Sequence, residues 1–245
     1  MLNIKKIIIS ALAFLGLAAS AAQATDNTPL WMRYSAISPD GKTIAFTYQG
    51  NIFTVPAEGG RALQITTNQS YDTQPVWSPD GSKIAFASYR LGGADIFVVS
   101  KDGGAPVRVT TNSANEFPIV FKDNNTILYS AYILPDPESM QFPSSTFSQV
   151  YQVDIEGGRP SMFSSLPLES ITFAPDGKTI LYHDKKGYED PWRKHHTSSI
   201  ARDIWSCQLN GNNVKDGAFT KITEFTGEDR NPVYAADGKS FYYLS

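Results

Sequence analysis

The stretch Ser38-Pro39-Asp40-Gly41-Lys42-Thr43-Ile44-Ala45-Phe46 decides the fold, because it occurs again almost unchanged at residues 78–86. A third copy occupies residues 174–182, and two copies with an altered Pro-Asp-Gly triplet occupy residues 121–129 and 235–243. Proline favours the second position of a type I turn, aspartate bonds to nearby backbone, and glycine supplies the positive φ that follows. The apolar, β-branched run after each turn is typical of a buried strand. Five such copies predict a repeat architecture.

A second turn signal follows the first three copies in chain order, at residues 38–46, 78–86 and 121–129. Glu58-Gly59-Gly60, Asp102-Gly103-Gly104 and Glu156-Gly157-Gly158 each separate two strand-like runs, which indicates a tight hairpin. In the fourth unit we expect a longer turn through Gly211, followed by a last strand at residues 220–223. A short strand such as Pro75-Val76-Trp77 also precedes each Asp-Gly turn, so each unit is expected to hold four antiparallel strands.

The spacing of the units indicates the architecture. The aspartates of successive turns (Asp40, Asp80, Asp123, Asp176 and Asp237) are 40 to 61 residues apart. Four-stranded units of this period are typical of β-propeller blades, whereas a β-sandwich, the alternative, does not predict matched pairs of turns. We therefore expect an all-β propeller with four complete blades and part of a fifth. The predicted blades cover approximately residues 34–67, 72–111, 116–165, 169–224 and, incomplete, 230–245.

The amino-terminal residues have the composition of an export signal. Lys5 and Lys6 precede an apolar run at residues 7–19, and Ala22-Gln23-Ala24 is a small-residue cleavage site. We predict a signal peptide at residues 1–24 that is cleaved after Ala24, leaving a propeller domain at residues 25–245. The apolar run is too short to span a bilayer, so we expect a periplasmic protein without a membrane span.

Composition narrows the remaining possibilities. The chain is 41% hydrophobic and 18% charged, which is typical of a protein that forms a core. Its formal net charge of −3 argues against a nucleic-acid-binding surface, which is normally basic. Cys207 is the one cysteine of the sequence, so no internal disulfide can form. We expect Cys207 to be a packed strand residue.

No residue of this chain is predicted to be catalytic, to bind a cofactor or to ligate a metal. His195 and His196 are adjacent, so their side chains point apart in an extended loop, and His183 is expected at a strand end. No Cys or carboxylate lies at a zinc-ligand spacing from them. The sequence has no Gly-x-Ser-x-Gly elbow, and Gly92-Gly93 lacks the lysine of a phosphate-binding loop.

Two insertions indicate the functional face. They lie between the second and third strands of the third and fourth units, at residues 133–148 and 185–201, and are expected opposite the Asp-Gly and Gly-Gly turns. Long loops gathered on one face of a rigid scaffold are a common place for binding. The second insertion combines cations with Tyr188 and Trp192, but Asp184, Glu189 and Asp190 offset its charge. We expect it to pack against a neighbouring domain or to line a substrate route rather than to bind nucleic acid, with a solvated loop as the alternative.

The Pro-Asp-Gly repeats, which match best at Asp40, Asp80 and Asp176, resemble those of the TolB protein and of tricorn-type proteases. Residues 187–199, followed by Arg202-Asp203-Ile204-Trp205, resemble the fourth-blade insertion of bacterial tricorn-like proteases. The resemblance implies a six-bladed propeller, of which this chain is a fragment, followed by a second propeller, a PDZ-like module and a serine peptidase domain. It places the catalytic residues in those later domains, so none is carried over to this chain.

The same resemblance implies a non-catalytic module that guides peptides or unfolded proteins to the peptidase domain, in a protein that could form homo-oligomers. Two alternatives stay open: a TolB-like periplasmic interaction propeller without enzymatic activity, and a propeller hydrolase of the prolyl-oligopeptidase type. The coding sequence after Ser245 would distinguish them. A PDZ-like module there would indicate the tricorn-like peptidase. An end after the sixth blade would indicate the TolB-like propeller, and an α/β-hydrolase elbow would indicate the propeller hydrolase.

Overall fold

The computed structural model describes residues 29–133, 147–187, 197–211, 213–235 and 237–245. The predicted signal peptide and parts of both insertions, including Tyr188, Trp192, His195 and His196, lie outside these residues. All eighteen strands of the described chain belong to one compact unit, residues 32–245. The described residues include no helix long and apolar enough to cross a membrane.

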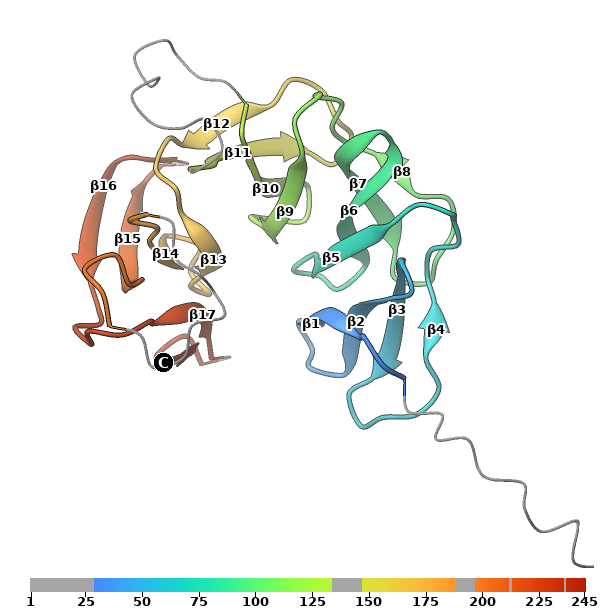
Figure 1. Ribbon diagram of the computed structural model, residues 1–245, viewed down its shortest axis with the longest axis horizontal. Coiled ribbons are helices and arrows are strands. Elements are labelled where there is room, and N and C mark those ends of the chain that lie inside the picture. The colour runs from blue at the N-terminus through green and yellow to red at the C-terminus, as the bar shows by residue number, and fades with distance from the viewer. Residues whose placement is uncertain (1–28, 134–146, 188–196, 212, 236) are drawn as a thin grey trace, which may run out of the picture. The chain divides into compact units, whose positions relative to one another are not determined.

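The strands form five antiparallel sheets in chain order (Figure 1). The first sheet holds β1 (Arg33–Ile37), β2 (Thr43–Tyr48), β3 (Asn51–Pro56) and β4 (Leu63–Gln64). The second holds β5 (Asp72–Trp77), β6 (Lys83–Leu91), β7 (Gly93–Ser100) and β8 (Val107–Arg108), and the third holds β9 (Glu116–Phe121), β10 (Thr126–Ala131), β11 (Gln149–Asp154) and β12 (Ser161–Ser164). The fourth holds β13 (Glu169–Phe173), β14 (Thr179–His183), β15 (Ile204–Asn210) and β16 (Asn213–Lys221), and the fifth holds β17 (Arg230–Tyr234) and β18 (Phe241–Leu244).

The sheets pack as the blades of a propeller. The first strand of each sheet contacts the first strand of the next, from β1 to β5, β9, β13 and β17 in turn. Later strands of a sheet pair only with their own neighbours, so each sheet extends away from this inner row. The predicted all-β propeller is therefore confirmed, with four four-stranded blades and two strands of a fifth.

Local hydrogen bonds build the Asp-Gly turns, as the sequence predicted. In the first blade, Asp40 Oδ1 accepts hydrogen bonds from Ser38 Oγ at 2.6 Å and from the Lys42 backbone N–H at 3.0 Å. Asp80 repeats this pattern with Ser78 and Ser82. These carboxylate bonds span two residues, so they favour the turn locally. The Asp80 backbone N–H also donates to Asn124 Oδ1 in the turn of the next blade at 3.0 Å.

The predicted long turn of the fourth blade is wrong. β15 continues to Asn210 and β16 begins at Asn213, and these two residues lie opposite each other. Gly211 has a φ of 66°, a conformation that allows a tight hairpin. The polar run that we assigned to a loop is therefore part of a nine-residue outer strand, and Ile222 and Thr223 lie beyond its end.

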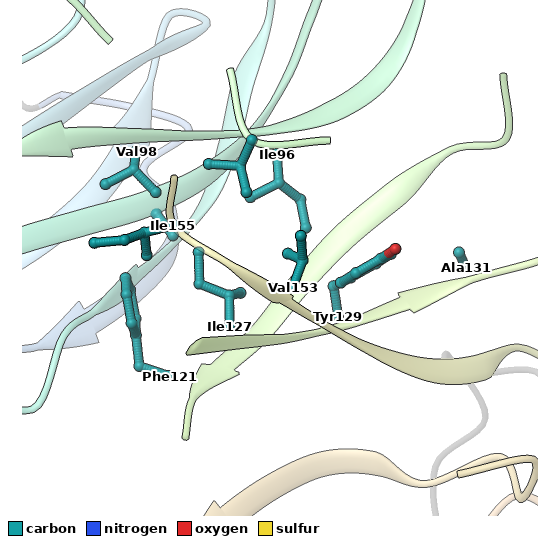
Figure 2. Packing of buried hydrophobic residues seen from close by; sticks show 10 residues of the cluster. Ile96, Val98, Phe121, Ile127, Tyr129, Ala131, Val153 and Ile155 are labelled. Carbon is teal, nitrogen blue, oxygen red and sulfur yellow. The ribbon is translucent and has the colours of Figure 1, made fainter. Parts of the chain in front are cut away.

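The core lies in the seams between blades. In the seam between the second and third blades, Ile96 and Val98 of β7 pack against Ile127 of β10 and Val153 of β11 (Figure 2). Cys207 is buried in the next seam, with Leu128, Val150 and Ile180, which confirms it as a packed strand residue. Each inner blade thus buries apolar side chains on both of its faces, and this holds the blades at fixed positions.

Candidate functional site

Two ends of the propeller differ in their connections. One end, here called the hairpin end, carries the turns between the first and second and between the third and fourth strands of each blade. The other, here called the connection end, carries the links between the second and third strands and between successive blades. In the second blade Leu91 lies opposite Gly93, so the link there is a tight turn. In the third and fourth blades the links run from 132 to 148 and from 184 to 203.

A pocket of about 450 Å³ opens at the connection end of the fourth blade. One wall comes from the second insertion, and the other comes from the link that leads to β17. Its lining residues are Lys186, Thr197, Ser198, Ser199, Ala201, Asp203, Lys221, Glu224, Phe225 and Thr226. The pocket is therefore formed by two segments that are far apart in the sequence.

Asp203 organises the charges of this pocket. Its carboxylate, whose side chain is nearly buried, forms ion pairs with Lys186 and with Lys221, whose Nζ lies at 3.0 Å. Lys186 Nζ also donates to the Ala201 carbonyl oxygen at 2.7 Å. Asp184 supports the floor, because it accepts hydrogen bonds from the Asp203 backbone N–H and from Trp205 Nε1. Lys186 Nζ also lies 3.7 Å from Asp184, so its three N–H donors face three oxygens, whereas Lys221, whose side chain is 42% exposed, keeps donors for a ligand.

The rest of the pocket combines hydroxyl groups with one aromatic ring. Thr197, Ser198, Ser199 and Thr226 supply hydroxyls, and the Phe225 side chain is 57% exposed. Among the described residues, no histidine lines the pocket. This arrangement can bind a polar chain with apolar side groups.

A second charged cluster surrounds Glu169 at the start of β13. Its carboxylate lies 3.1 Å from His183 Nε2, 3.4 Å from Lys185 Nζ and 3.4 Å from Arg202 Nε. Burial alone would raise the pKa of Glu169, but the His183 hydrogen bond and the neighbouring cations lower it to about 2. Arg202 also contacts Glu228 at 3.4 Å. Glu169 is therefore a structural anion that anchors the base of the second insertion.

His183 joins the fourth blade to the fifth. The Asn231 backbone N–H donates to His183 Nδ1 at 3.2 Å, so the ring proton resides on Nε2, where it faces Glu169. His183 lies at the end of β14, as predicted, and is buried. In the part of the chain that the structure describes, no three His, Cys, Asp or Glu side chains are grouped so that they could hold a metal ion.

Sequence reasoning missed the carboxylates at the beginnings of the inner strands. Asp72 and Asp229 each precede the turn aspartate of their blade by eight residues, and Glu116 and Glu169 do so by seven. This spacing was a usable signal. Its meaning depends on partners elsewhere in the chain, such as Arg90, which binds Asp72 at 3.1 Å.

Comparison with known proteins identifies the fold family. The family model of the tricorn protease N-terminal β-propeller domain matches residues 29–245. The chain is 24% identical over 216 residues to Tricorn protease homolog 1 of Streptomyces coelicolor, covering 87% of this chain and 19% of that protein. It is 28% identical over 305 residues to Dipeptidyl-peptidase 5 of Porphyromonas gingivalis, covering 100% of this chain and 43% of that protein. The chain thus spans less than half the length of these relatives.

Solved structures agree on the architecture. The tricorn protease aligns with a TM-score of 0.60 at 22% identity, covering 86% of this chain and 22% of that one. TolB from Acinetobacter baumannii aligns with a TM-score of 0.60 at 15% identity, covering 87% of this chain and 46% of that one. Identities this low show the fold alone. Since the family model covers nearly all of the sequence beyond the predicted signal peptide, the chain belongs to the tricorn protease N-terminal β-propeller domain family.

Proposed function

We propose that this chain is the non-catalytic propeller module of an exported tricorn-like serine peptidase. It docks peptides or unfolded protein segments at its connection end and presents them to a peptidase domain of the same polypeptide. Family membership supports the association with a peptidase. The pocket between the second insertion and the link to β17 is the observation that carries the docking role.

The chemistry of this pocket suits an extended peptide. The Lys221 ammonium group can donate to backbone carbonyl oxygens, and the surrounding hydroxyls can both donate and accept. The exposed Phe225 ring offers apolar area to substrate side chains of varied sequence. A site of this kind binds an unfolded chain without strict sequence preference, as a docking module requires.

The docking role is tested in the full-length protein with Phe225→Ala. An aromatic contact worth about 1–2 kcal/mol should lower kcat/KM about five- to thirtyfold for an unfolded protein substrate. A tetrapeptide that reaches the peptidase site without docking should be cleaved at an unchanged rate. The matched control is Val107→Ala at the hairpin end, where the removed side chain is 60% exposed.

Three results would contradict the proposal. Equal effects of Phe225→Ala and Val107→Ala on protein turnover would place docking elsewhere. A parallel loss of tetrapeptide cleavage would indicate a general effect on the enzyme. An absence of any peptide hydrolysis by the full-length protein would favour a TolB-like interaction propeller.

The predicted leader at residues 1–24 supports export to the periplasm as part of this proposal. Expression of the natural gene followed by cell fractionation should place the mature protein in the periplasmic fraction, with Thr25 as its first residue. Mass spectrometry of the amino terminus measures this directly. A cytoplasmic product that retains Lys5 and Lys6 would contradict the export part and leave the docking role to its own test.

A further inference from the structure

Glu116, the first residue of β9, is a buried carboxyl group that makes no hydrogen bond to the described residues. The residue is 0% exposed, and neither side-chain oxygen makes a hydrogen bond to the described part of the chain. Tyr129 on β10 is also 0% exposed, and its hydroxyl has no hydrogen-bond partner there either. Buried polar groups are nearly always hydrogen-bonded, since an unpaired buried charge is costly. Glu116 therefore requires a specific explanation.

The equivalent residue of the second blade shows what Glu116 lacks. Asp72 lies opposite Ser88 on the neighbouring strand, and Glu116 lies opposite Ala131 in the same register. Asp72 accepts two hydrogen bonds of 3.1 Å from Arg90 and one of 2.6 Å from Asn68. The residue equivalent to Arg90 in the third blade is Ile133. Residues 132–148, which follow β10, contain no lysine or arginine in their sequence, so this link has no cation to offer Glu116.

The charged groups of the surrounding strands are already paired. Asp95 on β7 lies near Glu116 and forms an ion pair with Arg108 on β8, whose NH2 group is 2.9 Å from the carboxylate. On the flanking blades, Arg90 is bound to Asp72, and Glu169 at the start of β13 is surrounded by its own cations. Glu116 thus faces a neighbouring carboxylate and a guanidinium group that pairs with that carboxylate through its NH2 group, while Arg108 Nε makes no hydrogen bond to the described residues.

These surroundings favour the neutral acid. Burial raises the pKa of Glu116 to about 7, and the charge of Asp95 raises it as well. The hydroxyls of Thr110 and Tyr129 and the charge of Arg108 act in the opposite direction, although neither hydroxyl makes a hydrogen bond of good geometry with Glu116. Because the folded chain binds this proton more tightly than the unfolded chain does, stability decreases as the pH rises from about 4.5 through about 7.

We propose that Glu116 makes the seam between the second and third blades a proton-dependent latch. The neutral acid fits at the connection end of this seam, beside Tyr129 and Ala131, which belong to its apolar cluster (Figure 2). The ionised form places an unpaired charge beside that cluster and loosens the contact between β9 and the second blade. Mild alkalinity therefore weakens this seam, and mild acidity closes it.

The latch is tested by equilibrium unfolding of the full chain at pH 5.5 and pH 8.5. Glu116→Gln keeps the shape of the side chain and removes its titration. We compare the unfolding equilibrium constant of the unaltered chain with that of Glu116→Gln at each pH. The ratio of the first constant to the second should be at least about tenfold larger at pH 8.5 than at pH 5.5. This follows because each unit of difference between the folded and unfolded pKa of Glu116 changes the unfolding constant up to tenfold. Glu58→Gln, at an exposed position, is the matched control and should leave this ratio constant. If the ratio between the unaltered chain and Glu116→Gln is the same at both pH values, as expected for the control, the proposal is overturned.

Hydrogen exchange measures the seam itself. After correction for the intrinsic exchange rate, amides of β9 and β10 should lose protection between pH 5.5 and pH 8.5 in the unaltered chain and keep it in Glu116→Gln. Equal loss in both proteins would overturn the latch. If Glu116→Gln does not fold, carbon-13 NMR of the glutamate carboxyl groups in the unaltered chain decides the question. A group that titrates near 7 supports the proposal, and titration of every glutamate below about 5 overturns it.

Discussion

The hairpin end and the connection end of this propeller are stabilised in different ways. At the hairpin end, the carboxylates of Asp40 and Asp80 accept hydrogen bonds from groups two residues away, and this pattern repeats from blade to blade. At the connection end, Arg90 reaches Asp72 across 18 residues, and Arg202 reaches Glu169 across 33. The first end is uniform because its bonds are local. The second end differs in every blade because each link supplies its own partners.

This difference explains where function can develop. A turn that bonds to itself tolerates little change without losing its shape. The connection end already depends on distant pairs, so a link can lengthen, as in the third and fourth blades, while the scaffold below remains intact. The pocket of the fourth blade belongs to this end, and so does Glu116 of the third, which makes no hydrogen bond within the described part of the chain.

The largest expected loss of stability comes from the connection end. Asp72→Asn removes the charge that neutralises Arg90, whose side chain is only 21% exposed. Breaking a buried ion pair from one side should cost about 3 kcal/mol of unfolding free energy. Chemical denaturation of the full chain measures the loss.

The control for this comparison is Asp102→Asn at the hairpin end. Lys101 and Asp102 form a pair whose side chains are 52% and 75% exposed, so the change should cost less than about 0.5 kcal/mol. Similar losses at the two positions would mean that burial does not distinguish the two ends.

A smaller loss is expected from Thr66→Val. The buried Thr66 hydroxyl accepts a 3.0 Å hydrogen bond from the Ile52 backbone N–H, and Thr110 and Thr223 do the same for Ile96 and Ile204 in their blades. Valine keeps the shape but leaves the N–H unpaired, which should cost about 1–3 kcal/mol. Thr67→Val, at the neighbouring exposed position, should be nearly neutral in the same denaturation series. A neutral Thr66→Val would show that water replaces the hydroxyl.

The hairpin end is tested by two glycine substitutions with the same backbone requirement. Gly177 and Gly238 have φ values of 66° and 64°, so replacing either by alanine should cost about 1 kcal/mol for the backbone conformation. A Cβ at Gly177 meets open space, whereas one at Gly238 comes within 2.7 Å of the Pro175 ring of the preceding blade. Thermal unfolding should therefore show a larger loss for Gly238→Ala. Equal losses would mean that the turn at Gly238 can move away from Pro175 without a cost in stability.

The smallest expected effect concerns the acid stability of the hairpin end. Hydrogen bonds from Ser78 and from the Ser82 backbone and side chain lower the pKa of Asp80 to about 2, below its usual 3.8. Its contribution to stability is present above pH 3.8 and is lost as the pH falls through about 2. Asp80→Asn should therefore reduce the difference in melting temperature between pH 5 and pH 2. An unchanged difference would show that the turn does not depend on the charge.

The fold could be predicted because its signals are local. The Asp-Gly and Gly-Gly turns, and the strands on either side of them, need only contacts between near neighbours in the chain, so the blades and the buried position of Cys207 follow from short stretches of residues. The turn through Gly211 was mispredicted, because a polar run joins a sheet only when a tight hairpin brings it beside β15.

The amino-acid sequence by itself therefore determined the blade repeat, the two kinds of turn and the end at which the insertions lie. Tertiary structure alone decided which charges meet: Lys186 and Lys221 at Asp203, Arg202 at Glu169, and no partner at Glu116 within the described residues. The physical reason is that an ion pair depends on distance in space. The strand register and the paths of the links set that distance, and residues many positions apart in the chain carry no local trace of it.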